Sequence, residues 1–232
     1  MTNYVGFDLE TTGVSSFRDT PVSFGFVEHL DVGGVIESVI DTGYVNPGVP
    51  IPQGAIAVHH ITDAMVADAT PLAEAVEHIA QRIRDVWASG GVIVGMNVGY
   101  DLTMIESLCH RFELLSLSGP DGPGAVMDIL VIDRHFDKWR KGKRTLGDLC
   151  RHYDVTLGDA HSASADAEAS LAILEAQRIR FVELDSLEVA QVNSTLRSWY
   201  QEWLTSFSSY LEKKGEAPVS PGRYEWPIHA HH

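Results

Sequence analysis

The segment VGFDLETTG, residues 5–13, alternates apolar and polar side chains as a β-strand does, yet it carries two acids. One face of this strand would be apolar and the other would hold both acids: Val5, Phe7 and Leu9 against Tyr4, Gly6, Asp8 and Glu10. Burying a lone carboxylate is very unfavourable, and two on one face also repel each other. No Lys or Arg precedes Arg18. The segment is therefore either an edge strand with one face in water or a strand whose acids hold a divalent cation.

The rest of the chain predicts an α/β fold with a mixed central sheet flanked by helices. Further strands are expected over residues 21–30, 35–45 and 90–98, and a strand or strand–helix junction over 125–133. Apolar residues at helical spacing predict helices over 72–86, 102–112, 144–153 and 165–181. Thr70 is expected to cap the first of these helices, with Pro71 in its first turn. Residues 45–58 are rich in Pro and Gly and are expected to form a loop.

The composition changes after Phe181, which divides the chain into a main domain over residues 1–181 and an appendage over 182–232. Residues 185–216 carry a stripe of aromatic and aliphatic side chains at steps of three and four, which predicts one added amphipathic helix. That stripe either packs on the main domain or forms a surface for a second copy or another partner. The tail from Ala217 to His232 shows no periodicity and is expected to be frayed.

The chain is strongly acidic, with 17 Lys and Arg, 32 Asp and Glu, and a net charge of −15 over 232 residues. This charge disfavours a protein that coats nucleic acid, because phosphate contacts need Lys and Arg. It fits a site where acids hold divalent cations. No apolar run reaches the roughly 18 residues of a membrane span, and no signal peptide is recognisable. We expect a soluble cytoplasmic protein with no membrane partner, and its two cysteines to be reduced thiols.

Three later polar residues join the two acids of the first strand in a pattern. Asp101 follows an expected buried strand and begins a helix, and His161 precedes a helix whose first turn holds Asp166. Taken alone, each acid is an ordinary helix-start residue favoured by the helix dipole, and the His is an ordinary surface residue. Taken together, they form an ordered series: D-x-E, then D, then H-x4-D.

With this series the chain resembles the DEDDh 3′→5′ exonucleases, the DnaQ-like branch of the RNase H-like fold. DLETTG matches the first motif, Asn97 with Asp101 the second, and His161 with Asp166 the third. The resemblance covers residues 4–180. Within this family the chain is most similar in pattern to the proofreading epsilon subunit of bacterial DNA polymerase III and its stand-alone relatives. The chain departs from the family pattern at positions that concern substrate contacts rather than metal ligands: His60 for a Gly, Met96 for a His and Tyr100 for a Phe.

The resemblance implies a mechanism for phosphodiester hydrolysis with two Mg²⁺ ions, for which Mn²⁺ would substitute. Asp8, Glu10 and Asp166 would hold the first ion, and Asp8 and Asp101 the second. His161 would act as the general base, since an unperturbed pKa near ~6.5 suits that role at neutral pH. The substrate would be a single-stranded DNA 3′ end, released as nucleoside 5′-monophosphates during replication proofreading or repair.

Substrate contacts are expected from two groups of residues. By the resemblance, Thr11, His59 and Asn97 would lie beside the terminal nucleotide, although a strand-end hydrogen bond for Thr11 and an ordinary loop position for His59 are equally open. The densest basic stretch, residues 133–153, suits single-strand binding because aromatic side chains are interleaved with cations. Phosphate contacts are expected there from Lys141, Lys143 and Arg144, unless the stretch is a solvated loop.

Other readings remain open at the level of the sequence. The same motifs occur in exoribonucleases of the superfamily, so RNA is an alternative substrate. A binding module that kept the fold without activity is a second alternative. The chain could also act as a proofreader bound to a DNA polymerase, or as a homodimer, with the C-terminal helix as the contact.

Overall fold

The computed structural model describes residues 2–120, 122–156, 158 and 162–230. In this part of the chain a six-stranded mixed sheet has the order β4-β3-β2-β1-β5-β6. The central strand β1 pairs antiparallel with β2 and parallel with β5. The bounds of the strands are β1 Tyr4–Thr11, β2 Pro21–Val32, β3 Val35–Asn46, β4 Thr70–Pro71, β5 Val92–Gly95 and β6 Val126–Asp128. The predicted mixed sheet is therefore confirmed.

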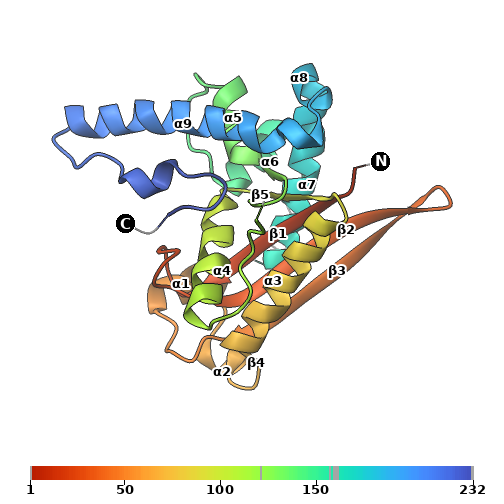
Figure 1. Cartoon of the computed structure of the whole chain (residues 1–232), viewed down its shortest axis with the longest axis vertical. Helices are drawn as coiled ribbons and strands as arrows, with labels where there is room; N and C mark the ends of the chain where they lie inside the picture. The colour runs from red at the N-terminus through yellow and green to blue at the C-terminus, as the bar shows by residue number, and fades with distance from the viewer. Residues whose placement is uncertain (1, 121, 157, 159–161, 231–232) are drawn as a thin grey trace.

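Helices cover both faces of this sheet, with α3 on one face and α7 on the other (Figure 1). On the α3 side, side chains such as Ile79 and Ile83 pack in one core with Val5 and Phe7 of β1. The bounds of the helices are α1 Gln53–His59, α2 Asp63–Val66, α3 Leu72–Ala88, α4 Gly99–Arg111, α5 Ile129–Phe136, α6 Leu146–Tyr153, α7 Ala163–Arg180, α8 Val182–Asp185 and α9 Val189–Lys213, with a 3₁₀ turn at Pro221–Tyr224. In the described residues no helix is long and apolar enough to cross a membrane.

Helix α7 lies unusually close to β1 and β2 because glycines face it. A Cβ on Gly6 would lie 2.6 Å from the carbonyl oxygen of Ala167, and one on Gly25 would lie 2.4 Å from the backbone nitrogen of Ser164. Gly6 shares its strand face with Asp8 and Glu10, so this close approach brings the start of α7 to the two acids. The small residues of the predicted 165–181 helix meet glycines here.

Two expected elements differ from what forms, and a third takes one of its two expected forms. Residues 45–58 were expected to be a loop, but α1 begins at Gln53, because an extended Pro52 stands at its N-cap and Ala and Ile residues follow. The helix over 72–86 has Pro71 rather than Thr70 at its N-cap. The 125–133 stretch is a junction, where Asp128 ends β6 and caps α5 by accepting bonds from the backbone nitrogens of Leu130 and Val131.

The C-terminal appendage packs on the main domain through α9. Val192, Leu196, Tyr200 and Leu204 are buried along one face of this helix. Trp199 stacks on His135 with ring centroids 4.1 Å apart, and Arg134 lies over the Trp203 ring. Figure 1 shows α9 crossing the end of the molecule next to α5. Of the two readings of the aromatic stripe, packing on the main domain therefore holds for this half of the helix, while Phe207 and Tyr210 remain partly exposed.

The expectation of a frayed tail is wrong for the described residues 217–230, called the C-terminal tail below. Trp226 and His229 are buried. Arg197 and Gln201 of α9 donate to the carbonyl oxygens of Trp226 and Tyr224, each at 2.8 Å. Sequence periodicity could not reveal this docking because the tail has little regular secondary structure and is fixed by single hydrogen bonds and buried rings.

Candidate active site

Three carboxylates meet at the carboxyl end of β1. Asp8 and Glu10 point from the same strand face, and Asp166 comes from the first turn of α7. One carboxylate oxygen from each of the three lies within 4.8 Å of the others. The glycine-mediated approach of α7 to β1 is what makes this distance possible.

Asp101 joins the cluster from the first turn of α4 and is 5% exposed. Because β1 and β5 run parallel, their carboxyl ends lie at the same edge of the sheet. Helix α4 begins four residues after β5 and so carries Asp101 to that edge. The charge of Asp101 is the largest electrostatic contribution from a neighbour to the pKa of Asp8.

Burial and mutual repulsion act on the carboxylates of the cluster. Burial raises the pKa of Asp8 well above its ordinary value, and the neighbouring carboxylates raise it further. Burial and the charge of Asp166 raise the pKa of Glu10 to about 7, and burial also raises the pKa of Asp101. Among the described residues no Lys, Arg or His forms an ion pair with Asp8, Glu10 or Asp101. Closely spaced carboxylate oxygens in a site of this kind are the donor set that Mg²⁺ and Mn²⁺ prefer.

The expected general base, His161, lies outside the described residues. His59 is buried at the end of α1, and its Nδ1 accepts a 3.0 Å hydrogen bond from the backbone nitrogen of Ile61. It lines a cavity of about 570 Å³ together with Ser162 and Ser164, which lie four and two positions before Asp166 in the chain. The structure thus places His59 beside the start of α7. His60, at the usual Gly position, has a left-handed φ of 61°, a conformation that Gly adopts easily.

Thr11 and Asn97 line a cleft of about 850 Å³ next to the carboxylates. Thr11 follows Glu10 and donates a 2.7 Å hydrogen bond from Oγ1 to the carbonyl oxygen of Gly13. Tyr100 also lines the cleft, and its hydroxyl donates to the same oxygen at 2.7 Å. The strand-end hydrogen bond expected for Thr11 is therefore present, and the same side chain borders the cleft.

Asp128 is a site residue that the sequence analysis missed. It is 2% exposed, and its Oδ1 accepts a 3.0 Å bond from the backbone nitrogen of Asn97. Asn97 has a left-handed φ of 57°, so this bond holds a turn between β5 and α4 in a conformation that a non-glycine residue rarely adopts. An acid after an apolar run and before a helix was the available signal, but it indicates only a cap.

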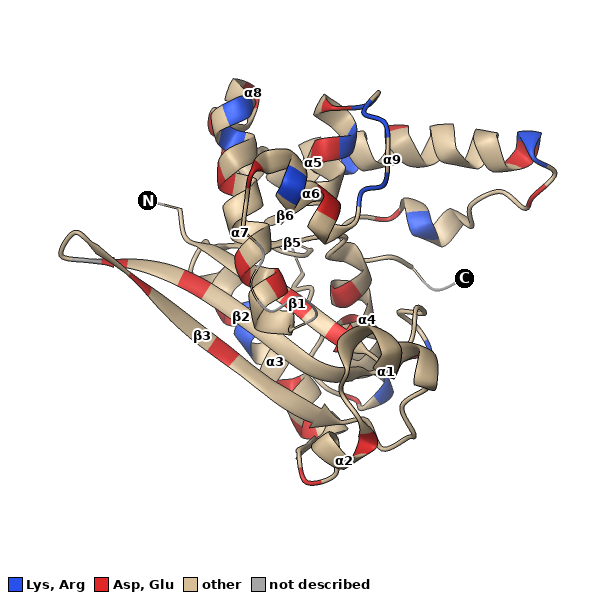
Figure 2. Ribbon diagram, turned by 180° about the vertical axis from the view of Figure 1, so that it is seen from behind, with Lys and Arg blue, Asp and Glu red and all other residues tan. Residues whose placement is uncertain are grey.

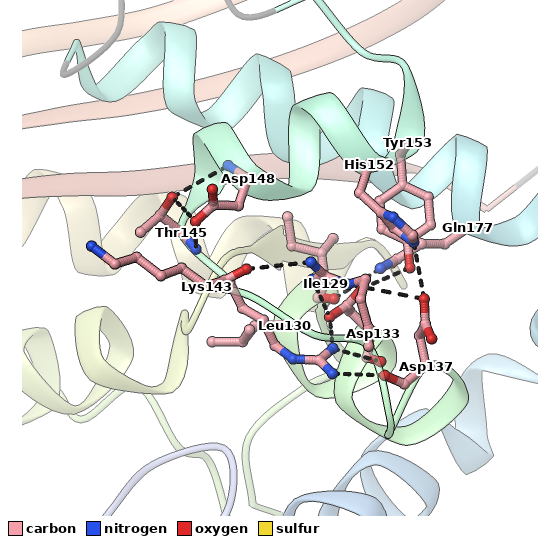
Figure 3. Close-up of polar contacts among 12 residues, drawn as sticks. Ile129, Leu130, Asp133, Asp137, Lys143, Thr145, Asp148, His152, Tyr153 and Gln177 are labelled. Carbon is pink, nitrogen blue, oxygen red and sulfur yellow. Dashed lines mark hydrogen bonds and ion pairs between the residues drawn. The ribbon is translucent and has the colours of Figure 1, made fainter.

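The basic stretch is divided between structural and exposed cations. Arg140 and Arg144 both form ion pairs with the fully buried Asp133, and the Tyr153 hydroxyl donates to the same carboxylate at 3.0 Å. Figure 3 shows these contacts, with the Lys143 side chain extending away from them. Lys141 and Lys143 are exposed. Figure 2 shows the basic run on the loop between α5 and α6. Arg144 thus holds this loop to the core, whereas the two lysines face solvent.

A second group of possible metal ligands lies near this loop: Asp133, Asp137 and His152. Its carboxylates already have cationic partners. Arg140 lies 2.9 Å from Asp133, and the guanidinium groups of Arg140 and Arg180 each lie 3.9 Å from Asp137. This group is therefore an ion-pair network that fixes α5 to α6, in contrast to the cluster at β1.

Comparison with known proteins agrees with the site. Residues 5–174 match the family model of the RNase T exonucleases. The chain belongs to this family. The match contains Asp8, Glu10, Asp101 and Asp166, and the expectation of a DnaQ-like exonuclease is confirmed.

Relatives of this RNase T family member include much longer proteins. It is 32% identical over 167 residues to the PolC-type DNA polymerase III of Lacticaseibacillus paracasei, covering 72% of this chain and 11% of the relative. It is 29% identical over 195 residues to that of Caldanaerobacter subterraneus subsp. tengcongensis, covering 83% and 13%. The chain thus spans only about a tenth of the length of these relatives.

Solved structures share the fold. E. coli exonuclease I in complex with a dT13 oligonucleotide superimposes with a TM-score of 0.62 at 18% identity, covering 79% of this chain and 42% of that chain. The zinc-bound form of the E. coli exonuclease I–single-stranded DNA complex gives a TM-score of 0.64 at 19% identity, with the same coverage. The predicted RNase H-like exonuclease fold is confirmed.

Proposed function

We propose that this exonuclease removes nucleotides from the 3′ end of single-stranded DNA in a reaction that depends on divalent cations. The observation that carries the proposal is the carboxylate cluster at the end of β1, where three acids lie within 4.8 Å and a fourth adjoins them. Two comparisons support DNA as the substrate: the relatives are DNA polymerases, and exonuclease I of similar fold was solved with a DNA oligonucleotide.

The residues of the cluster fit two divalent cations. Asp8, Glu10 and Asp166 would hold one cation, and Asp8 with Asp101 a second; Mg²⁺ is the proposed ion, with Mn²⁺ as a substitute. When bound, the cations would lower the pKa of the attacking water and neutralise charge on the leaving oxygen. His161 would accept the proton of that water, and the products would be nucleoside 5′-monophosphates.

The residues around the cluster would position the strand. Thr11 and Asn97 border the cleft beside the acids, and His59 lies beside the start of α7, so all three are proposed contacts of the terminal nucleotide. Lys141 and Lys143 are proposed phosphate contacts because they are exposed. A similar contact from Arg144 would have to compete with its ion pair to Asp133.

The proposed cellular role is proofreading or repair of DNA in the cytoplasm, by analogy with the polymerases that the chain resembles. The partly exposed end of α9, with Phe207 and Tyr210, is the surface proposed to contact a polymerase or a second copy of the chain.

The test is hydrolysis of a 5′-labelled single-stranded DNA oligomer with Mg²⁺ or Mn²⁺, beside a matched RNA. The wild type should give a metal-dependent ladder that shortens from the 3′ end. Asp8→Asn should abolish it, because Asp8 contributes to both cation sites. Asp68→Asn, which changes an exposed acid outside the cluster, should leave it intact. A stronger ladder on RNA would instead identify an exoribonuclease, and no ladder on either substrate would contradict the proposal.

A further inference from the structure

The C-terminal tail docks on the helix that carries Asp101. The backbone nitrogen of His229 donates a 2.8 Å hydrogen bond to Oγ1 of Thr103, two residues after Asp101. The carbonyl oxygen of Pro227 lies so close to Gly99 that a Cβ there would be 2.9 Å away. At its other end the tail is tied to α9, where the backbone nitrogen of Val219 donates to Oγ of Ser208 at 3.1 Å. The tail therefore has a fixed position relative to the carboxylate cluster.

This docking makes the tail a wall of the cleft beside the active site. The 850 Å³ cleft is lined by Thr11, Asn97 and Tyr100 next to the acids, by the loop that follows β1, and by tail residues Val219 and Arg223. Figures 1 and 2 both show the C-terminal segment next to the loop after β1. Segments from the two ends of the sequence thus enclose one cleft.

Two arginines line the cleft, although the chain as a whole has a net charge of −15. Its described lining contains two arginines, Arg18 and Arg223, and neither Asp nor Glu. Both arginines are exposed, and neither forms an ion pair with another described residue. This differs from Arg140 and Arg144, whose charges are taken up by the buried Asp133.

Tyr200 and His229, which adjoin Arg223, do not offset its charge, whereas Glu225 lies two residues further along the tail. Burial lowers the pKa of His229 to about 4 and raises that of Tyr200, so both side chains are neutral near pH 7. The adjoining cavity of about 700 Å³ shares Phe17 and His229 with the cleft, but its lining contains two acids, Glu106 and Glu225, together with Arg197. A polyanion leaving the carboxylate cluster would therefore meet two arginines and no acid in the lining of the Arg223 cleft, and both acids and an arginine in the adjoining cavity.

We propose that the C-terminal tail forms part of the nucleic-acid site and that Arg223, together with Arg18, binds backbone phosphates of the strand next to its 3′ end. The inference rests on the proposed function, because it takes the substrate to be a single strand that ends at the carboxylates. Ser15 and Ser16 of the loop after β1 also line the cleft, and their hydroxyl groups would be further phosphate donors. Val14, which is 96% exposed in that loop, offers apolar surface to a base.

The test is equilibrium binding of a 5′-fluorescein-labelled oligothymidylate, followed by anisotropy over a range of salt concentrations, with Ca²⁺ in place of Mg²⁺ to limit hydrolysis. Arg223→Glu should weaken binding about tenfold and lower the salt slope by about 0.7, the value for one lost phosphate contact on a single strand. Arg223→Lys should retain most of the affinity, since the positive charge remains. Lys213→Glu makes the same change of net charge on an exposed residue at the end of α9, outside the cleft, and should bind as the wild type does.

Equal affinity of the wild type and Arg223→Glu would overturn the inference, as would an equal loss in Lys213→Glu, which would show an effect of net charge alone. Thermal unfolding of each variant confirms that the fold is retained. The inference and the proposed function fail separately. Binding that depends on Arg223 without hydrolysis of the oligomer by wild type in Mg²⁺ or Mn²⁺ would contradict only the function. Hydrolysis with no dependence on Arg223 would contradict only the inference, and no binding by the wild type would contradict both.

Discussion

Glu10 lies in the carboxylate cluster with a pKa raised from 4.5 to about 7, and the pKa values of Asp8 and Asp101 are raised as well. Between pH 4.5 and about pH 7, Glu10 in the folded, metal-free protein retains a proton that it loses in the unfolded chain. Its stability should therefore be highest below about pH 4.5, as far as this group is concerned, and should fall as the pH rises through about 7. Thermal unfolding in EDTA across this range measures the effect. A stability that rises with pH over the same range would contradict the assignment of burial and repulsion as the causes of the raised pKa.

Replacing Asp8 separates repulsion from metal binding. Asp8→Asn should raise the unfolding temperature of the metal-free protein at about pH 8, because one negative charge is removed from the cluster. In the wild type, free Mg²⁺ at a hundred times its Kd should add about 2.7 kcal/mol of stability, and Asp8→Asn should lose this gain. Asp68→Asn is the matched control and should keep it. A full Mg²⁺ gain in Asp8→Asn would place the cation elsewhere.

The individual acids could be predicted from the sequence because their spacing and order are local properties of three motifs. Asp8 and Glu10 lie where the alternation of the first strand puts them, and Asp166 lies in the first turn of its helix. Asp128 and Arg223 could not be predicted in the same way. Asp128 acts through a bond to the backbone of Asn97, 31 positions away. The place of Arg223 in the cleft depends on where the tail docks.

At the scale of elements, the distance between α7 and β1 sets the geometry of the site. Gly6→Ala would place a Cβ 2.6 Å from the Ala167 carbonyl oxygen, so the helix must shift. We expect a loss of about 1–3 kcal/mol in the free energy of unfolding, as for overpacked cores, and weaker Mg²⁺ binding because Asp166 moves with α7. Urea unfolding and a Mg²⁺ titration measure the two effects.

Gly54→Ala is the control for this substitution. Gly54 lies in α1 with nothing within 4 Å of an added Cβ, so Ala should stabilise the protein by up to about 1 kcal/mol through helix propensity. If Gly6→Ala were as well tolerated as Gly54→Ala, the close approach of α7 would have no energetic importance.

Most helices and strands could be predicted from the hydrophobic periodicity of the sequence, and the exceptions have physical reasons. Helix α1 was hidden because its flanks are rich in Pro and Gly, while the helix itself spans only seven residues, about two turns. The 125–133 stretch is apolar except for Asp128 and Asp133, and a short apolar run does not distinguish a strand from a buried helix. Only the caps, Pro52 and Asp128, mark the boundaries in these places.

At the scale of the whole molecule, α9 is part of the main core although the composition suggests a separate appendage. Leu196 is fully buried in the same cluster as the residues of the sheet. Leu196→Ala should lower the free energy of unfolding by about 2–5 kcal/mol, the range for a buried Leu, in a single transition that includes the sheet. Far-UV circular dichroism during urea unfolding measures it.

Ser198→Ala, on an exposed position of the same helix, should change the free energy of unfolding by less than about 0.5 kcal/mol. A small effect of Leu196→Ala, or two separate transitions in the wild type, would support the division at residue 181 that the sequence suggests. Composition can suggest such a division, but it does not indicate whether the apolar face of a helix is covered by the same chain or by another.

The bond between Thr103 and His229 joins residues 126 positions apart. Closing a long loop carries an entropic penalty that grows slowly with loop length, and single hydrogen bonds and two buried rings offset it along this tail. The tail is therefore expected to open by local unfolding at lower free energy than the sheet, so that its amides exchange hydrogen faster than those of β1. Such an opening would leave the carboxylates in place and would remove one wall of the cleft. The affinity for a nucleic-acid strand would then depend on the equilibrium between the docked and the open tail. The global stability of the protein does not control this equilibrium.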